Sequence, residues 1–294
     1  MVQSFMDITP QLTNAKRYFP KTDIPPRPRI ITEILQLLEQ DSASFGKIAC
    51  LVRSDPALAG SVLLIVNSAY FGLSQKVVTV AQAIGLLGVQ NIKNLVMASA
   101  MRNAMTDSAD PFLTEFWVTS SEIAHFAAFI AREHTTIPYE EAFTAALFHN
   151  AGLPLMHKRF ARFEQKYVAG LKLTARSVVE LEDVQFGTNH CEVGALLASK
   201  WQLPEQIRIA ILCHHRVPHY LAHPHIDPDT KRLLSIIKLA EYLCYQFHPN
   251  FDYINLGEWS AISNLVLDQL SISTDMLRNI TATLKQLREC NGAS

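Results

Sequence analysis

The chain has 294 residues, of which 49% are apolar and 18% are charged, and its formal net charge is −1. This composition predicts a substantial buried core, in one large domain or in two subdomains that share it. A net charge so close to zero argues against a general electrostatic attraction to nucleic acid or to acidic membranes. The N-terminal region lacks the apolar core of a signal peptide, and no segment approaches the roughly 20 apolar residues that span a bilayer. We therefore expect a soluble, cytoplasmic protein.

Helical periodicity runs through most of the chain, so the predicted fold class is all-α. Apolar positions recur at spacings of three and four over 30–40 and 43–53. Asp55 and Pro56 are an N-cap and a first-turn proline for a third helix. The only segments that could form strands, such as KVVTV at 76–80, are short and isolated.

Segments 80–87 and 89–105 are predicted to be two helices joined by a tight turn at Gly88. A helix–glycine–helix unit invites comparison with DNA-binding helix-turn-helix motifs. A DNA-reading unit needs several cations for the phosphates, whereas this one carries only Lys93 and Arg102. We therefore interpret the unit as ordinary helix packing and expect no nucleic-acid partner.

The segment DSADP at 107–111 is the best internal boundary. It divides the chain into an N-terminal helical part, 1–108, and a second helical part, 109–294. Ten of the eleven histidines lie between 125 and 225, within the second part. The proline-rich segment 216–229 is the longest loop candidate.

His149 and Asn150 end the apolar run EEAFTAALFH, just before Gly152 and Pro154. Counted from Phe143, they fall at offsets six and seven, so both flank one side of the helix end. The spacing fits two interpretations. The pair either caps the helix or addresses a common site as a ligand pair.

His190 follows Asn189, which is a good N-cap, and Glu192 completes a pattern like a capping box. Val193, Leu197 and Trp201 follow His190 at offsets of three, seven and eleven, so His190 points with the apolar face toward the core. A buried histidine that bonds to the backbone and a metal ligand are both compatible with this position.

His214 and His215 close the run PEQIRIAILCHH that begins at Pro204. His214 continues the buried stripe of this helix, and His215 lies at its edge. Neutral imidazoles at the inner end of a helix suit metal ligation, and they equally suit capping of the last carbonyl groups. Of the other histidines, His125 is expected to point to solvent, and those at 219, 223 and 225 are expected on the surface.

The five cysteines form no CxxC pair and no regular spacing, which is typical of reduced thiols in a cytosolic core. Cys191 and Cys213 each lie beside a histidine in sequence, so a Cys/His metal site is an alternative. Side chains that are neighbours along a helix diverge by about 100°, which disfavours this alternative.

Several separated motifs together resemble the HDOD family. PALAGSVLLIVNSAYFGL at 56–73 and AIGLLGVQNIKNLV at 83–96 resemble the N-terminal half of HDOD domains. FW at 116–117, AFTAALFHNAGLPLM at 142–156 and NHCEVGALLASKWQLPEQIRIAILCHH at 189–215 resemble the second half. LDQLSISTDMLRNI at 267–280 is similar to the end of longer members, so the resemblance covers about 24–285.

The resemblance implies an HD-like helical bundle with an additional N-terminal helical subdomain, in a family associated with bacterial signalling. HDOD proteins are relatives of the HD and HD-GYP phosphohydrolases that have mostly lost the catalytic metal site. In the HD pattern a His, a His-Asp pair and a later Asp hold a metal, and here these positions fall on Thr119, His149, Asn150 and Glu241. The candidate ligands of this degenerate site, which can be empty, are His149, His190, His214, His215 and Glu241.

The altered positions argue against hydrolysis. Asn150 is neutral and cannot supply the charge of an aspartate, and Thr119 cannot replace an imidazole. Glu241 can still coordinate, although its extra methylene shifts the carboxylate. A divalent or transition metal ion is the cofactor that the remaining ligands suit, but a metal-activated hydroxide is hard to build without the aspartate.

We therefore expect a non-catalytic regulatory protein of signal transduction that binds a protein partner or a small signalling ligand. The alternative is a divergent metal-dependent phosphohydrolase that acts on a phosphoester or a cyclic dinucleotide. Regulation through DNA binding by the 80–105 unit is the third and weakest interpretation.

Overall fold

The computed structural model describes residues 12–20, 23–38, 45–105, 109–167, 177–248 and 256–292, and within these ranges it contains helices and no strand. The elements before residue 106 are α1 (Thr13–Tyr18), α2 (Arg29–Leu38), α3 (Phe45–Arg53), α4 (Pro56–Val66), the 3-10 turn η2 (Ala69–Phe71), α5 (Val80–Leu87) and α6 (Val89–Met105). Those that follow are α7 (Pro111–His134), α8 (Tyr139–Phe148), α9 (Gly152–Arg159), α11 (Val178–Phe186), α12 (His190–Lys200), α13 (Glu205–Cys213), α14 (Val217–Leu221), α15 (Pro228–Gln246), α16 (Leu256–Leu270) and α17 (Thr274–Gly292). The predicted all-α class is confirmed.

Three helices begin with the same Asp-Pro pair. The side chain of Asp55 accepts the N–H of Leu58 at 3.0 Å, and Pro56 is the first residue of α4, as predicted. Asp110 caps α7 and Asp227 caps α15 in the same way, each with a proline next in sequence. An aspartate that satisfies free N–H groups and a proline that lacks one define these helix starts locally.

The segment KVVTV forms no strand, and its last residue, Val80, begins α5. Asn67, at the end of α4, accepts the N–H of Val77 through Oδ1 and donates to the Val77 carbonyl through Nδ2, both at 2.7 Å. One amide side chain thus satisfies the backbone of Val77 in both directions. Gly88 then joins α5 to α6 with φ of +80°, as expected for a glycine turn.

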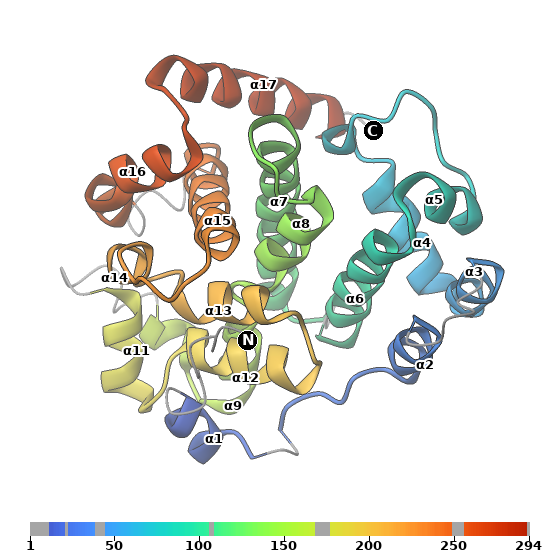
Figure 1. Ribbon diagram of the computed structural model, residues 1–294. Coiled ribbons are helices and arrows are strands. Elements are labelled where there is room, and N and C mark those ends of the chain that lie inside the picture. Colours follow the sequence, from blue (N-terminus) through green and yellow to red (C-terminus); the bar gives the residue numbers. More distant parts are fainter. Residues whose placement is uncertain are drawn as a thin grey trace.

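The long helix α7 lies at the centre of the molecule, with α8 and α15 packed against it (Figure 1). Helices α2–α6 pack together on one side, and α6 joins them to α8. One continuous cluster of buried side chains extends from Leu12 to Leu284. The expected boundary at 108 lies outside the described residues, and α1 packs on α12, so the division at 108/109 stays a prediction.

Two expectations about histidine-containing segments were wrong. The proline-rich segment 216–229 is not a continuous loop, because Val217–Leu221 forms α14. His125 does not point to solvent but packs against the rings of Tyr70 and Phe143, at centroid distances of 5.2 Å. Helical periodicity correctly placed His125 on the side of α7 opposite Phe116. That side does not face solvent, because η2 covers it.

In the part of the chain that the structure describes, no single helix has the length and apolar character needed to cross a membrane. Only α3 and α4 taken together reach that length and composition, and they are bent by 112° at their junction.

Candidate functional site

Four histidines from three helix ends meet in the interior. His149 follows α8, His190 begins α12, and His214 and His215 follow α13. The rings of His149 and His190 lie 5.1 and 5.2 Å from that of His214, between centroids, and His215 lies 4.3 Å from it. The structure therefore brings together all four histidines that the sequence analysis proposed as ligands; whether they hold an ion stays a prediction.

Glycines allow the helices that carry these histidines to approach. A Cβ atom at Gly152 would lie 2.0 Å from the backbone oxygen of His190. A Cβ atom at Gly194 would lie 3.3 Å from the backbone nitrogen of Gly152. The glycine of the HNAG segment thus has a steric role, because it lets α9 lie directly against α12.

Backbone carbonyls orient two of the rings. Nδ1 of His149 lies 2.5 Å from the carbonyl of Ala146, and Nδ1 of His214 lies 2.7 Å from that of Ile211. A carbonyl oxygen only accepts, so each Nδ1 carries a proton and each neutral ring has its lone pair on Nε2. Both histidines therefore cap their helices and also offer a lone pair to the cluster.

Carboxylates orient the other two rings. Nδ1 of His190 donates to Oε2 of Glu182 at 2.7 Å, and both side chains are 1% exposed. Nδ1 of His215 lies 3.1 Å from Oε2 of Glu258. A carboxylate is the usual outer partner of a metal-binding histidine. It accepts the Nδ1 proton and leaves Nε2 free to coordinate. The sequence analysis did not identify Glu182 or Glu258.

The capping box predicted at the start of α12 is only half formed. Asn189 accepts the N–H of Glu192 at 3.0 Å, as predicted. The Glu192 carboxylate, however, accepts from the hydroxyl of Thr188 at 3.2 Å. Glu182 takes the place of the second capping group and accepts the N–H of His190 at 2.9 Å.

Neighbouring charges set the protonation of the cluster. Burial, together with His215 and His149, holds the pKa of His214 well below its usual range, so this ring is neutral. Burial also opposes the charged form of His190, yet Cys191 and Glu182 hold the pKa of His190 well above its usual range. The pKa values of these two adjacent imidazoles are thus shifted in opposite directions.

The buried Lys238 forms an ion pair with Glu241. Nζ of Lys238 lies 2.5 Å from Oε2 of Glu241 and 3.1 Å from Oε2 of Glu258. The side chains of Lys238 and Glu241 are each 4% exposed. Burial opposes all three charges, but the two carboxylates raise the pKa of Lys238, and Lys238 keeps the pKa of Glu241 well below its usual range. The sequence analysis missed Lys238, although its spacing of three from Glu241 places both on one side of a helix.

The remaining positions of the HD pattern carry no charge. Asn150 is 8% exposed, and its Oδ1 lies 3.1 Å from Nε2 of His214. Thr119 is also 8% exposed, on α7. Oε1 of Glu241 lies 3.7 Å from Nε2 of His149, whose buried nitrogen has no hydrogen-bond partner in the described structure.

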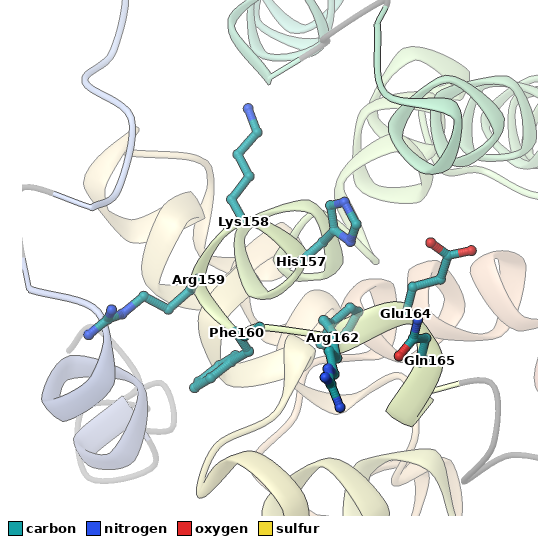
Figure 2. A pocket seen from close by; sticks show the side chains of 9 residues that line it. His157, Lys158, Arg159, Phe160, Arg162, Glu164 and Gln165 are labelled. Atoms are coloured by element: carbon teal, nitrogen blue, oxygen red, sulfur yellow. The ribbon is translucent and has the colours of Figure 1, made fainter.

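A crevice at the edge of the histidine cluster is small. The crevice that reaches Cys191 and His215 has a volume of about 10 Å³, which is room for about one water molecule. A larger hollow of about 420 Å³ lies at the surface, over the segment 157–165 at the end of α9 (Figure 2). Its basic side chains do not converge, since Lys158 and Arg162 point in opposite directions.

A second group of side chains also presents metal-ligand atoms, namely Glu122, Cys244 and His248. Here the guanidinium of Arg288 forms an ion pair with the carboxylate of Glu122, and its Nε lies 2.5 Å from Oε1. A fixed cation at this distance disfavours a metal ion, so we interpret the group as a polar contact that holds α17 against α7 and α15.

An all-helical fold with histidines at converging helix ends is the arrangement that the resemblance to the HDOD family implies. Residues 24–217 match the family model described as the HDOD domain, which is about two thirds of the chain. The chain belongs to the HDOD family.

Known proteins similar to this chain carry several functional descriptions. It is 26% identical over 224 residues to an uncharacterised protein of Treponema pallidum (strain Nichols), a match of 74% of this chain and 41% of that protein. The chain therefore spans about two fifths of this curated relative.

A candidate phosphohydrolase from Shewanella amazonensis SB2B is similar in structure, with a TM-score of 0.65, 22% identity and 93% coverage of each chain. A candidate signal transduction protein from Marinobacter aquaeolei VT8 has a TM-score of 0.69 and 18% identity, over 98% of this chain and 65% of that one. At these identities the structural likeness shows a shared fold.

The residues present do not fit the catalytic ion of the HD pattern. Such an ion requires carboxylates at the positions of Asn150 and Glu241, but the first is an amide and the second is paired with Lys238. An ammonium beside the remaining carboxylate repels a divalent cation.

Proposed function

We propose that this chain is a non-catalytic HDOD-type regulatory protein, which acts in cytoplasmic signal transduction and binds a protein partner or a small signalling ligand. The observation that carries the proposal is the ammonium of Lys238, 2.5 Å from Glu241. It supplies inside the fold the positive charge that a metal ion supplies in an HD phosphohydrolase.

Two further features support a binding role. Metal-assisted hydrolysis needs an ion, an activated water and room for a phosphoester, whereas the crevice beside Cys191 and His215 has a volume of about 10 Å³. The surface hollow over 157–165, with about 420 Å³, has the size of a small-ligand site. Lys158, Arg159 and Arg162 line this hollow, and because their side chains diverge they favour a broad acidic surface on a partner over one small anion.

Hydrolysis assays test the proposal. Full-length protein is supplied in turn with Mg²⁺, Mn²⁺, Fe²⁺ and Zn²⁺, and is incubated with cyclic dinucleotides and with a phosphomonoester. We expect product formation no faster than with the His149→Ala variant. Turnover at about 1 s⁻¹ or more, which is ordinary for an enzyme, would refute the proposal if His149→Ala abolished it.

The alternative is a divergent phosphohydrolase, which is favoured by the Nε2 lone pair of His149 and by the description of the Shewanella neighbour. It makes a separate prediction. In an active enzyme the ammonium of Lys238 must move away from Glu241 before this carboxylate can bind the ion. Removal of the ammonium in Lys238→Met would therefore raise activity. A Lys238→Met variant that folds and remains inactive with every metal would leave the alternative without support.

A further inference from the structure

A second cavity lies between the N-terminal helices and α9, away from the histidine cluster. Its volume is about 330 Å³. Three parts of the chain line it, namely the segment between α1 and α2 with Phe19 and Asp23, the end of α6 with Ala104 and Met105, and α9 with Leu155. A concave site of this volume, between elements that are distant in sequence, is typical of small-molecule binding.

The inner surface of this cavity is apolar. Phe19 and Met105 are each 2% exposed, and Leu155 is 5% exposed, so these side chains line the inside of the cavity and not its rim. Faces that dock a protein instead expose large apolar side chains, as Leu64 of α4 does at 70%. The cavity therefore suits the apolar body of a free small molecule better than a flat partner surface.

Two cations lie at the cavity, and one of them is already paired. Nε of Arg159 lies 3.6 Å from Oδ2 of Asp23 and donates to the carbonyl of Tyr18 at 3.2 Å. Lys158 is exposed, and no ion pair within the described ranges includes it. Figure 2 shows its side chain extending away from that of Arg162. An ammonium beside an apolar cavity favours a ligand that carries an anionic group next to an apolar one.

We infer that this cavity binds a small amphipathic anion, with its acidic head group at Lys158 and its apolar body against Met105 and Leu155. The inference rests on the proposed role as a binding protein and names a ligand class for it. Such a ligand contacts both α6 and α9, so it links the N-terminal helices to the helix that directly follows the segment of His149 and Asn150.

Calorimetric titration of the full-length protein with octanoate tests the inference. Octanoate joins one carboxylate to a straight apolar chain, and octan-1-ol is the matched ligand without the charge. We expect saturable binding of about one octanoate per chain. Octan-1-ol should bind at least about tenfold more weakly, because the hydrogen bond from Lys158 to a carboxylate is charge-assisted.

Two pairs of variants locate the ligand. Ala104 is exposed and lines the cavity, so Ala104→Trp should fill the cavity and abolish octanoate binding. Asn103→Trp, at the neighbouring exposed position of α6, is outside the cavity and should leave the affinity unchanged. Lys158→Met should weaken binding by about tenfold, whereas Lys166→Met, which removes an exposed charge elsewhere, should not.

Thermal melts of the ligand-free variants check that each one folds, and Ala104→Phe provides a second obstructing variant if Ala104→Trp does not fold. The inference would be overturned if the wild type showed no saturable binding or if a folded Ala104 variant bound octanoate with full affinity. Equal affinities for octanoate and octan-1-ol, or equal losses in Lys158→Met and Lys166→Met, would also overturn it, because the head group would then not be bound at Lys158. These binding results are independent of the hydrolysis assays, which test the non-catalytic role.

Discussion

The ammonium of Lys238 lies 2.5 Å from Oε2 of Glu241 inside the protein, and both side chains are 4% exposed. The resemblance to the HD pattern assigns Glu241 to the position of a metal-bound carboxylate. The ammonium of Lys238 also contacts Glu258 of α16, so this one side chain links α15 to α16.

Replacement of this lysine should be costly. Lys238→Met keeps the length of the side chain but leaves two carboxylates without their cation, and loss of one partner from a buried ion pair costs about 3–5 kcal/mol. We expect the free energy of unfolding in urea to fall by this amount. Lys285→Met, on the exposed side of α17, is the control and should change it by less than about 0.5 kcal/mol. Equal effects of the two substitutions would contradict the structural role of Lys238.

Glu258 should make the protein sensitive to acid. Burial opposes its charge, but His215 and Lys238 lower the pKa of Glu258 to about 2. A depressed folded pKa contributes stability that is complete above the unfolded pKa of about 4.3 and is lost as the pH falls toward 2. Glu258→Gln should therefore be less stable than the wild type at pH 7, and the gap should close between pH 4.5 and 2.

Urea titrations at pH 7, 5, 4, 3 and 2 measure this gap, with Glu289→Gln on the surface of α17 as the control. A gap that stays constant from pH 7 to pH 2 would show that the carboxylate of Glu258 contributes through shape and not through charge.

His125 should add a second loss of stability at milder acidity. Burial lowers the pKa of His125 to about 4, and its Nε2 has no hydrogen-bond partner in the described structure. Because the unfolded chain takes up this proton near pH 6.5 and the folded chain does not, stability falls as the pH drops from 6.5 to 4. The contribution is on the order of 3 kcal/mol.

His125→Phe keeps an aromatic ring beside Tyr70 and Phe143 and removes the titrating group. We expect a smaller decrease in unfolding free energy between pH 7 and 4 than in the wild type. His219→Phe, on the exposed side of α14, should leave the wild-type decrease unchanged. The same pH profile in wild type and His125→Phe would show that other groups carry the dependence.

Gly152 should tolerate no side chain. An alanine methyl group would lie 2.0 Å from the backbone oxygen of His190, and a backbone atom cannot move aside cheaply. We expect Gly152→Ala to lower the melting temperature strongly, with a loss of about 3 kcal/mol. Gly85→Ala is the matched control, because nothing lies within 4 Å of its Cβ position and it sits in a helix. It should stabilise the protein by about 0.5–1 kcal/mol. A stable Gly152→Ala variant would show that α9 need not lie against α12.

Much of the helical framework could be predicted from local patterns. Asp55 and Pro56 begin α4, Gly88 separates α5 from α6, and His149 and His214 end their helices as expected. Each of these signals acts within a few residues of the chain, through hydrogen bonds of a helix end or through the freedom of one glycine. The order of the motifs also indicated the family before any contact was known.

The chemistry of the site was decided by contacts between distant residues. Lys238 and Glu258 are 20 positions apart, and His214 meets Asn150 across 64. Periodicity can place a side chain on the inner face of a helix, but it does not say which element covers that face. For this reason His125 was assigned to solvent, and Cys191 was assigned away from His190, although its Sγ lies 3.5 Å from Nε2 of that ring.

The sequence by itself determined that the chain is helical, that four of its histidines stand at helix ends and that a neutral asparagine follows His149. These properties depend on residue type and on spacing along one helix. Only the tertiary structure decided that Lys238 also contacts Glu258 and that the ring of His214 meets Asn150. Each of these contacts joins residues of different elements at 3.1 Å, and the packing of the whole core sets those distances.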